Sequence, residues 1–243
     1  AEPIGMELTD QHQNNSRYRR ELTICYDKVG NALSATHDYV PALDYFRKSL
    51  AIREQLSSLD PQNAVARRDL SVSYDKIGST LKELKQKSEA LGYFKKALDN
   101  DQALWEADKT NSQAHEDLSI SMLEYADMQL STGDGAGALD NYRKSAAIRE
   151  QLCKDDPTNA GLRVELAESY GKIGDGLSSL ASRKFGAASD WTEAQGWYRK
   201  ALSILTALRD AKTLPESSSK DIEEVTGKLA KCEAALRVQG HGG

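Results

Sequence analysis

The sequence predicts an all-α protein, a right-handed superhelical solenoid of antiparallel helix hairpins with a C-terminal capping helix. Three observations predict this fold. The chain repeats with a 48-residue period, its apolar residues follow a helical period, and short polar or glycine-containing stretches separate the periodic segments. Such repeats bury their apolar faces against one another. We therefore expect a long surface, rather than an enclosed pocket, to be the functional feature.

The 48-residue period appears at three kinds of position. The recurring sets are Leu22, Leu70, Leu118 and Leu166; Asn15, Asn63, Asn111 and Asn159; and Gly30, Gly78, Ala126 and Gly174. Each asparagine is expected to begin a helix, because its side chain can accept hydrogen bonds from the free N–H groups of a first turn. The predicted repeats span residues 13–60, 61–108, 109–156 and 157–211 of a single repeat domain that covers residues 1–243.

Each repeat contains two amphipathic segments joined by a short turn. In the first repeat, the first segment carries Leu22, Tyr26, Val29 and Leu33 on one helical face. The second segment begins about twelve residues after the small residue of the repeat. It opens with the pairs Ala42-Leu43, Ala90-Leu91 and Ala138-Leu139. Each repeat is therefore predicted to be a helical hairpin.

Together these residues resemble the tetratricopeptide repeat. The resemblance rests on an aromatic residue, a small residue four positions later, an alanine twelve further on and a second aromatic after another four. In the first two repeats these are Tyr26, Gly30, Ala42 and Phe46, and Tyr74, Gly78, Ala90 and Phe94. The period exceeds the usual tetratricopeptide period of about 34 residues, and is similar to that of the longer repeats of kinesin light chain and of bacterial tandem arrays. The resemblance implies close helix contacts at the small residues and a concave groove lined by the first helices.

The ends and the fourth repeat depart from the regular pattern. Residues 1–12 are interpreted as the remnant of a preceding second helix, because Ile4 and Leu8 fall one repeat period before Ile52 and Leu56, so the chain is expected to come from a longer protein. Residues 217–238 are predicted to form the capping helix. Eight extra residues lie near Ser182 to Trp191, and they form either a loop or a pair of longer helices.

Composition limits the classes of function. The chain has 243 residues and a net charge of −5, which argues against nucleic acid as a partner, and it contains no long apolar run that would span a membrane. Basic pairs recur in the second helices and are interpreted as a solvated outer face. They are Arg47-Lys48, Lys95-Lys96, Arg143-Lys144 and Arg199-Lys200. The compartment is not determined by the sequence, although cytoplasmic location is favoured.

No catalytic, cofactor or metal motif is present in the sequence. The four histidines and three cysteines lack the spacing of metal ligands. Cys25 is interpreted as a small packing residue, since serine takes its place in the later repeats. We expect no enzyme activity, no cofactor and no metal.

The polar faces of the first helices are the predicted partner-binding groove. Its candidate residues are Asp27, Asn31, Asp75, Ser79, Lys82, Leu123, Asp127, Leu130, Asp175 and Ser178, and the fourth repeat adds Val164, Ala167 and Gly171 to the same face. The aspartates favour a neutral to basic protein or peptide segment, and Leu123 with Leu130 is expected to hold an apolar anchor. Alternatively, Leu130 is buried in place of the leucine missing at Gln129.

Two classes of function follow. The first is a protein–protein interaction scaffold that binds a peptide or partner segment in the groove. The second is a structural, self-association or regulatory arm of a larger multidomain protein, with self-association through the truncated N-terminal end. The phrase Ile-Arg-Glu-Gln-Leu with its Asp-Pro turn resembles arrays at the C-termini of bacterial multidomain proteins, including Ser/Thr kinases.

Overall fold

The computed structural model describes residues 16–182 and 187–240, and within these ranges the regular elements are all helices. They are α2 (Ser16–Ala35), α3 (Tyr39–Leu59), α4 (Ala64–Glu83), α5 (Lys87–Ala107), α6 (Ser112–Thr132), α7 (Gly135–Asp155), α8 (Ala160–Ala181), α9 (Ala188–Asp210), a short 3₁₀ helix (Glu216–Ser218) and α10 (Asp221–Gly240). The predicted remnant at residues 1–12 lies outside the described residues.

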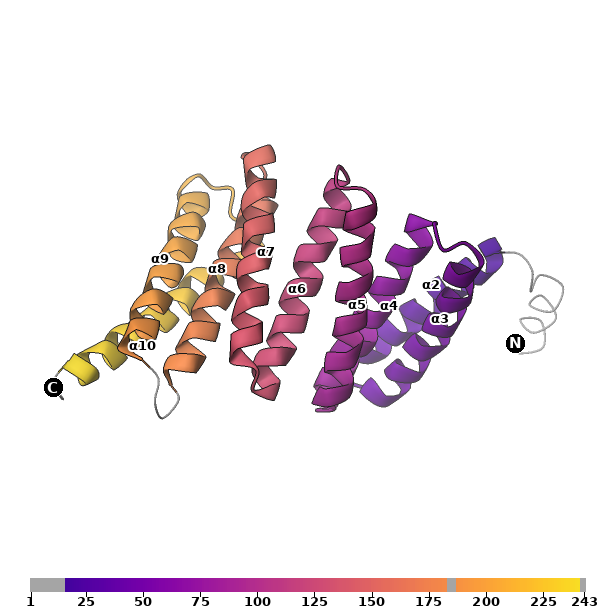
Figure 1. The fold of residues 1–243 in the computed structure, drawn as a ribbon, viewed down its shortest axis with the longest axis horizontal. Coiled ribbons are helices and arrows are strands. Elements are labelled where there is room, and N and C mark those ends of the chain that lie inside the picture. The colour runs from indigo at the N-terminus through magenta and orange to yellow at the C-terminus, as the bar shows by residue number, and fades with distance from the viewer. Residues whose placement is uncertain (1–15, 183–186, 241–243) are drawn as a thin grey trace. The chain divides into compact units, whose positions relative to one another are not determined.

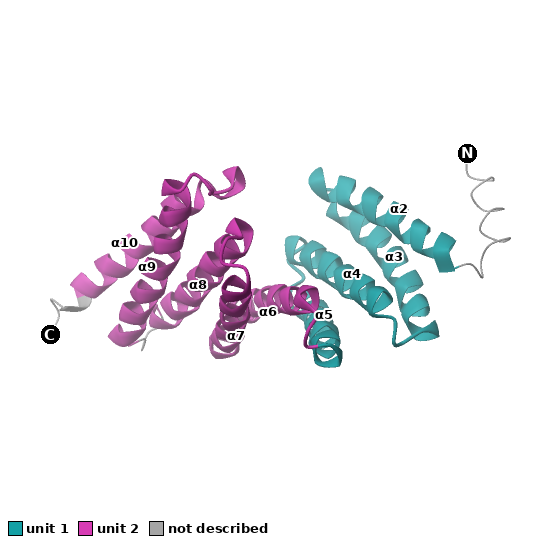
Figure 2. Ribbon diagram, turned by 90° about the horizontal axis from the view of Figure 1, so that it is seen from above, with its two compact units in different colours: residues 1–108 teal, residues 109–243 magenta. Residues whose placement is uncertain are grey.

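Consecutive helices form antiparallel hairpins (Figure 1). The chain divides into two compact units, residues 1–108 and 109–243 (Figure 2). In the first unit, α3 packs against both α2 and α4, and α4 packs against α5; in the second, the same succession runs from α6 to α10. Each hairpin is thus completed by its sequence neighbour, which confirms the predicted all-α solenoid.

The recurring asparagines begin the first helix of a hairpin, as predicted. The side chains of Asn63, Asn111 and Asn159 accept hydrogen bonds from backbone N–H groups three residues ahead, at 3.0, 3.1 and 3.2 Å. These bonds satisfy donors that a helix start leaves without an intrahelical acceptor. Asn15 lies outside the described residues.

The turn inside each of the first three hairpins contains one residue in the left-handed region. These residues are His37, Lys85 and Gly133, with φ angles of 61°, 62° and 100°, and they occupy the same position of successive repeats. A left-handed residue reverses the chain tightly after a helix, and only glycine adopts that conformation without a steric penalty. The backbone of the turn therefore repeats even though the residue type does not.

The small residues of the repeat lie against the aromatic residue of the second helix. A Cβ atom at Gly30 would fall 2.5 Å from the Phe46 ring, and one at Gly78 would fall 3.0 Å from the Phe94 ring. Gly174 has the same relation to Tyr198, at 2.5 Å. The two helices of a hairpin approach closely here because the small residue leaves room for the ring.

The C-terminal helix α10 covers the last hairpin. Its buried residues Val225 and Cys232 join the core that α8 and α9 contribute to the second unit. The extra residues of the fourth repeat fall partly in helices, because α8 has 22 residues and α9 has 23, against 21 each for α6 and α7. The others lie between Ala181 and Ala188, where residues 183–186 are outside the described part of the chain.

Candidate functional site

The predicted groove residues differ in their exposure. Asn31, Ser79 and Lys82 are exposed. The half-buried members are Asp75, Asp127, Leu130, Asp175 and Ser178. Asp27 and Leu123 are buried, with 7% and 6% of their surfaces exposed. The prediction that these two residues face a partner is therefore wrong.

Asp27 belongs to a buried ionic cluster. Arg53 of α3 donates from Nη2 to its carboxylate at 2.9 Å, and Lys76 of α4 lies 3.1 Å from the same oxygen. Arg53 also donates to the hydroxyl of Ser73 at 2.6 Å. Because a buried charge needs a compensating partner, this carboxylate is committed to joining α2, α3 and α4.

The two aspartates of the second unit are also engaged by neighbouring helices. Asp127 accepts a 2.6 Å hydrogen bond from the Tyr142 hydroxyl and pairs with the Lys172 ammonium at 2.6 Å. Asp175 repeats the arrangement with a second tyrosine and lysine. Its partners are Tyr198 at 2.7 Å and Lys228 at 2.9 Å. Each aspartate thus links its own hairpin to the next helix, which reduces the acidic charge open to a partner.

The two leucines predicted to hold an anchor lie against the core of the second unit. Leu123 is a core residue, and Leu130 is partly buried against the same cluster. Gln129 remains inside, with its amide donating to Asp134 at 2.7 Å and accepting from Asn141 at 2.7 Å. The helix therefore does not rotate to replace Gln129 with Leu130, because the amide finds polar partners where it stands.

A cleft of about 410 Å³ lies on the predicted groove face of the second unit, between α8 and α10. Four residues give it an apolar floor: Val164, Ala167, Leu205 and Val225. Its charged residues are Glu168, Lys172, Asp175, Asp221, Glu224 and Lys228. The cleft joins a small apolar surface to a rim with four carboxylates and two ammonium groups.

The cleft results from three replacements within the repeat. In the first hairpin the buried triplet is Asp27, Arg53 and Ser73, joined by hydrogen bonds. The equivalent residues at the last hairpin are Gly171, Leu205 and Val225, and all three line the cleft. A Cβ at Gly171 would meet no atom within 4 Å. The volume that a long polar pair fills in the first hairpin is therefore open here.

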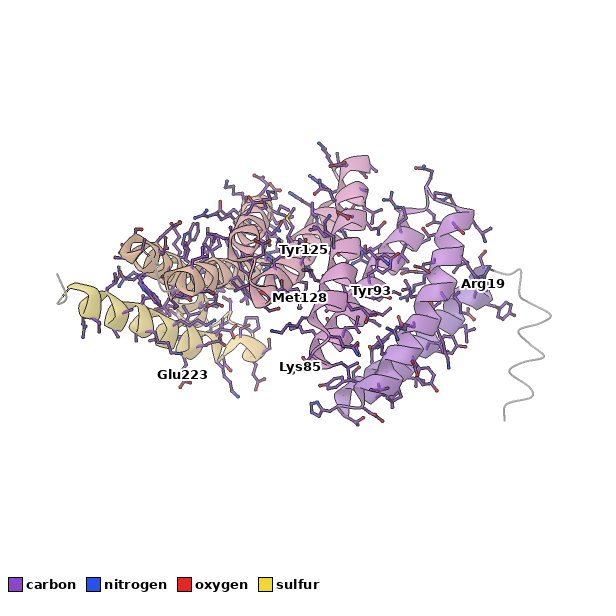
Figure 3. The ribbon with its side chains drawn as sticks, turned by 60° about the horizontal axis from the view of Figure 1, so that its bottom comes forward. Arg19, Lys85, Tyr93, Tyr125, Met128 and Glu223 are labelled. Carbon is purple, nitrogen blue, oxygen red and sulfur yellow. The ribbon has the colours of Figure 1, made fainter. Side chains whose placement is uncertain are left out.

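The lysines of the cleft are held in place by their carboxylate partners. Burial lowers the pKa of Lys228, but the hydrogen bond with Glu224 and the charge of Asp175 outweigh burial and raise it above its ordinary value. The pKa of Glu224 is lowered, because Lys228 stabilises its ionised form. Glu223 lies on the solvent side of α10 (Figure 3). The positive charges of Lys172 and Lys228 are thus balanced by carboxylates, and the excess of carboxylates over ammonium groups gives the rim its acidic character.

The recurring basic pairs of the second helices have structural partners. Arg47 pairs with Glu89 and Arg143 with Glu193, each joining one hairpin to the second helix of the next. Lys200 lies 3.9 Å from the centre of the Trp197 ring. These contacts agree with the interpretation of the basic pairs as a solvated face, because all of these charges remain near water.

Sequence reasoning missed the buried arginines and the part of the cleft contributed by α9 and α10. Arg53 and Arg149 stand two repeat periods apart, and both are buried. The sequence did contain a signal that aspartates are engaged by neighbouring side chains. Tyrosine occurs at positions 142 and 198, where the preceding helix carries an aspartate, whereas phenylalanine occurs at positions 46 and 94, where the preceding helix carries Asn31 or Ser79.

Cys25, interpreted from the sequence as a packing residue, is exposed.

Two kinds of feature are absent from the described part of the chain. Its helices include none that is long and apolar enough to cross a membrane. Residues 16–182 and 187–240 also contain no group of three or more His, Cys, Asp or Glu side chains that could hold a metal ion.

One hairpin of the chain matches a known repeat family. A family model described as tetratricopeptide repeat matches residues 23–63, which lie in α2, α3 and the turn that follows. No curated protein sequence matches the chain.

Solved structures share the fold at low sequence identity. BtubC (BKLC) from P. vanneervenii has a TM-score of 0.60 and 16% identity over 77% of this chain, which spans 65% of that protein. A putative kinesin light chain of Podosopora anserina with nearly identical TPR-like repeats has a TM-score of 0.54 and 17% sequence identity. The match covers 95% of this chain and 90% of that one. The yeast histone chaperone Hif1 has a TM-score of 0.55 and 12% sequence identity, and the match covers 92% of this chain and 97% of that one. One hairpin of the chain thus matches the tetratricopeptide model, and the chain shares its helical-repeat fold with these structures.

Proposed function

We propose that this chain is a protein–protein interaction scaffold that holds a partner segment in the cleft between α8 and α10. Tetratricopeptide folds are used for such recruitment, and the histone chaperone Hif1 is described as a scaffold protein recruiting protein complexes. The cleft on the groove face of the fourth hairpin carries the proposal, because it combines concavity, an apolar floor and a charged rim.

The chemistry of the cleft favours a neutral to basic segment with one compact apolar side chain. The floor residues Leu205 and Val225 would contact the apolar side chain, and the space beside Gly171 would admit it. Lys172 and Lys228 are already paired with Asp127 and Asp175. Asp221 would then attract a lysine or arginine flanking the anchor, together with Glu168, whose exposed carboxylate also pairs with Arg149 at 3.2 Å.

The test is selection of binders from a displayed library of random twelve-residue peptides, followed by affinity measurement on variants. Gly171→Leu fills the cleft, and because a Cβ there meets no atom within 4 Å, the helix should tolerate it. We expect the selected peptides to lose at least about tenfold in affinity for this variant, as expected when an anchor pocket is closed.

The matched control is Gly196→Leu. Gly196 is an exposed glycine of α9 with open space around its Cβ position, and it does not line the cleft. The peptide affinity of this variant should match that of the unmodified chain, and raised salt should weaken binding only moderately. Equal affinity of Gly171→Leu and the unmodified chain would place the binding site elsewhere and contradict the proposal.

A further inference from the structure

The outer face of α2 is an apolar surface that its repeat equivalents bury. Val29 is 40% exposed, whereas Ile77 and Ile173, which stand at the same position of later repeats, are fully buried. Leu33 is half-buried, whereas its equivalents Leu81 and Leu177 are 0% and 2% exposed. Helix α2 therefore carries the same apolar stripe as α4 and α8, but the stripe on α2 is less buried.

In the second and fourth hairpins this stripe is covered by the second helix of the preceding hairpin. Within the first unit α3 lies on α4, and within the second α7 lies on α8. Both covering helices contain the sequence Ile-Arg-Glu-Gln-Leu, at residues 52–56 and 148–152. The same intramolecular interface therefore occurs twice, once in each unit.

Two polar contacts recur in that interface and fix its register. The tyrosine of the stripe donates to the glutamate of the covering helix, Tyr74 to Glu54 at 3.5 Å and Tyr170 to Glu150 at 2.8 Å. The buried arginine donates to the serine that precedes the tyrosine. These bonds are Arg53 to Ser73 at 2.6 Å and Arg149 to Ser169 at 3.0 Å.

Helix α2 has the residues needed for the same contacts. Cys25 and Tyr26 occupy the positions of the serine and the tyrosine. The Tyr26 ring is held by Tyr45 at a centroid distance of 6.0 Å, as Tyr74 is held by Tyr93 at 6.2 Å. The receiving side of the interface is thus arranged on α2. Arg19, labelled in Figure 3, lies outside it, because it donates to Gln55 of α3.

We propose that the outer face of α2 binds a helix of the Ile-Arg-Glu-Gln-Leu type from a partner polypeptide. Val29, Leu22 and Leu33 would contact the apolar residues of that helix, Tyr26 would donate to its glutamate, and Cys25 would lie beside its arginine. The inference goes beyond the proposed cleft, which lies in the other unit.

Two other occupants fit less well. A second copy of this chain is disfavoured, because its own helices with this sequence, α3 and α7, already cover α4 and α8. Residues 1–12 carry Ile4 and Leu8 in the corresponding register, but Gly5 and Met6 stand where the arginine and glutamate are required. A partner helix with both charged residues provides the contacts that these alternatives lack.

The test uses a synthetic peptide with the sequence of residues 39–59, which contains Ile52, Arg53, Glu54 and Leu56 and no cysteine. The chain provides a natural control in residues 87–107, where Asp101 and Gln102 replace the arginine and glutamate. Fluorescence anisotropy should show binding of the first peptide and at least about tenfold weaker binding of the second. Binding should also slow alkylation of Cys25, the one exposed cysteine of the three.

Matched variants of the chain locate the contact. Val29→Asp should abolish peptide binding, whereas Val72→Asp should leave it unchanged, because Val72 has nearly the same exposure, 39%, on another face of the same unit. Circular dichroism should show that both variants stay folded. Equal binding of the two peptides, or binding that survives Val29→Asp, would overturn the proposal.

Two further outcomes would assign the face to a different occupant. If the peptide binds only after Ile4→Asp with Leu8→Asp, residues 1–12 of the chain itself cover α2. If sedimentation shows a dimer that Val29→Asp dissociates, a second copy covers it. Either result overturns the partner-helix proposal, and neither affects the cleft, whose test depends on Gly171.

Discussion

Tyr142 donates a 2.6 Å hydrogen bond to Asp127, whose other carboxylate oxygen pairs with Lys172 at 2.6 Å. The three side chains come from α7, α6 and α8, so one carboxylate joins both helices of the third hairpin to the fourth. Burial, followed by the charge of Asp127, raises the pKa of Tyr142 above its ordinary value. Burial lowers the pKa of Lys172, but the charge of Asp127 and its hydrogen bond outweigh burial, so this pKa is also raised.

These shifts predict a loss of stability in alkaline solution. In the unfolded chain Tyr142 ionises at about pH 10, whereas in the folded chain it keeps its proton to higher pH. Above that pH the unfolded state binds fewer protons, so the free energy of unfolding falls as pH rises. The raised pKa of Lys172 acts in the same direction. Urea unfolding between about pH 7 and about pH 11 measures this decline.

Tyr142→Phe should reduce the alkaline decline while lowering stability near pH 7. The lost hydrogen bond to a charged acceptor corresponds to about 1.5–3 kcal/mol at neutral pH. Tyr45→Phe is the control, because the contacts of Tyr45 with Tyr26 and Lys48 are made by its ring, which phenylalanine keeps. The explanation fails if the two variants have the same pH dependence.

Gly78→Leu should be strongly destabilising. A Cβ at Gly78 would lie 3.0 Å from the Phe94 ring, and the rest of a leucine has no room between α4 and α5. Overpacking costs about 1–3 kcal/mol, which exceeds the gain of about 1 kcal/mol from removing a helical glycine. Gly92→Leu, at an exposed position with open space, should be neutral or stabilising in the same thermal melts. Equal melting temperatures would contradict the close contact.

The left-handed turn residues predict opposite effects for two substitutions. Lys85→Gly should stabilise the first unit by up to about 1 kcal/mol, because glycine removes a left-handed penalty of about 1–2 kcal/mol but adds unfolded-state entropy. Gly133→Ala should destabilise by about 1–2 kcal/mol, although its Cβ would meet no atom within 4 Å. Chemical denaturation of both variants measures these changes, and a stabilising Gly133→Ala would refute the assigned turn conformation.

Leu123→Ala should act on stability through the core. Leu123 packs in the core of the second unit, and truncating a buried leucine costs about 2–5 kcal/mol. Leu130→Ala should cost less, because Leu130 is only partly buried. Urea unfolding of the two variants compares them. A larger loss for Leu130→Ala would mean that α6 is rotated from the position described.

The sequence by itself determined the hairpin repeat. Its period fixes where Asn63, Asn111 and Asn159 cap helices and where Gly30, Gly78 and Gly174 meet aromatic rings. These features are either local to one helix or recur at the repeat period, so helical spacing and capping chemistry are sufficient to predict them. The solenoid follows from them, because each hairpin lacks a complete core until its neighbour supplies one.

The tertiary structure decided which polar residues are open to a partner. Asp27 and Leu123 lie on the face that a helical wheel assigns to solvent, yet both are buried. For Asp27 the reason is that Arg53 and Lys76, from the two following helices, reach over that face. The cleft beside Gly171 also depends on Leu205 and Val225, which are remote in sequence. One-dimensional periodicity gives the direction of a side chain on its own helix, but burial depends on the lengths of side chains that other helices project toward it.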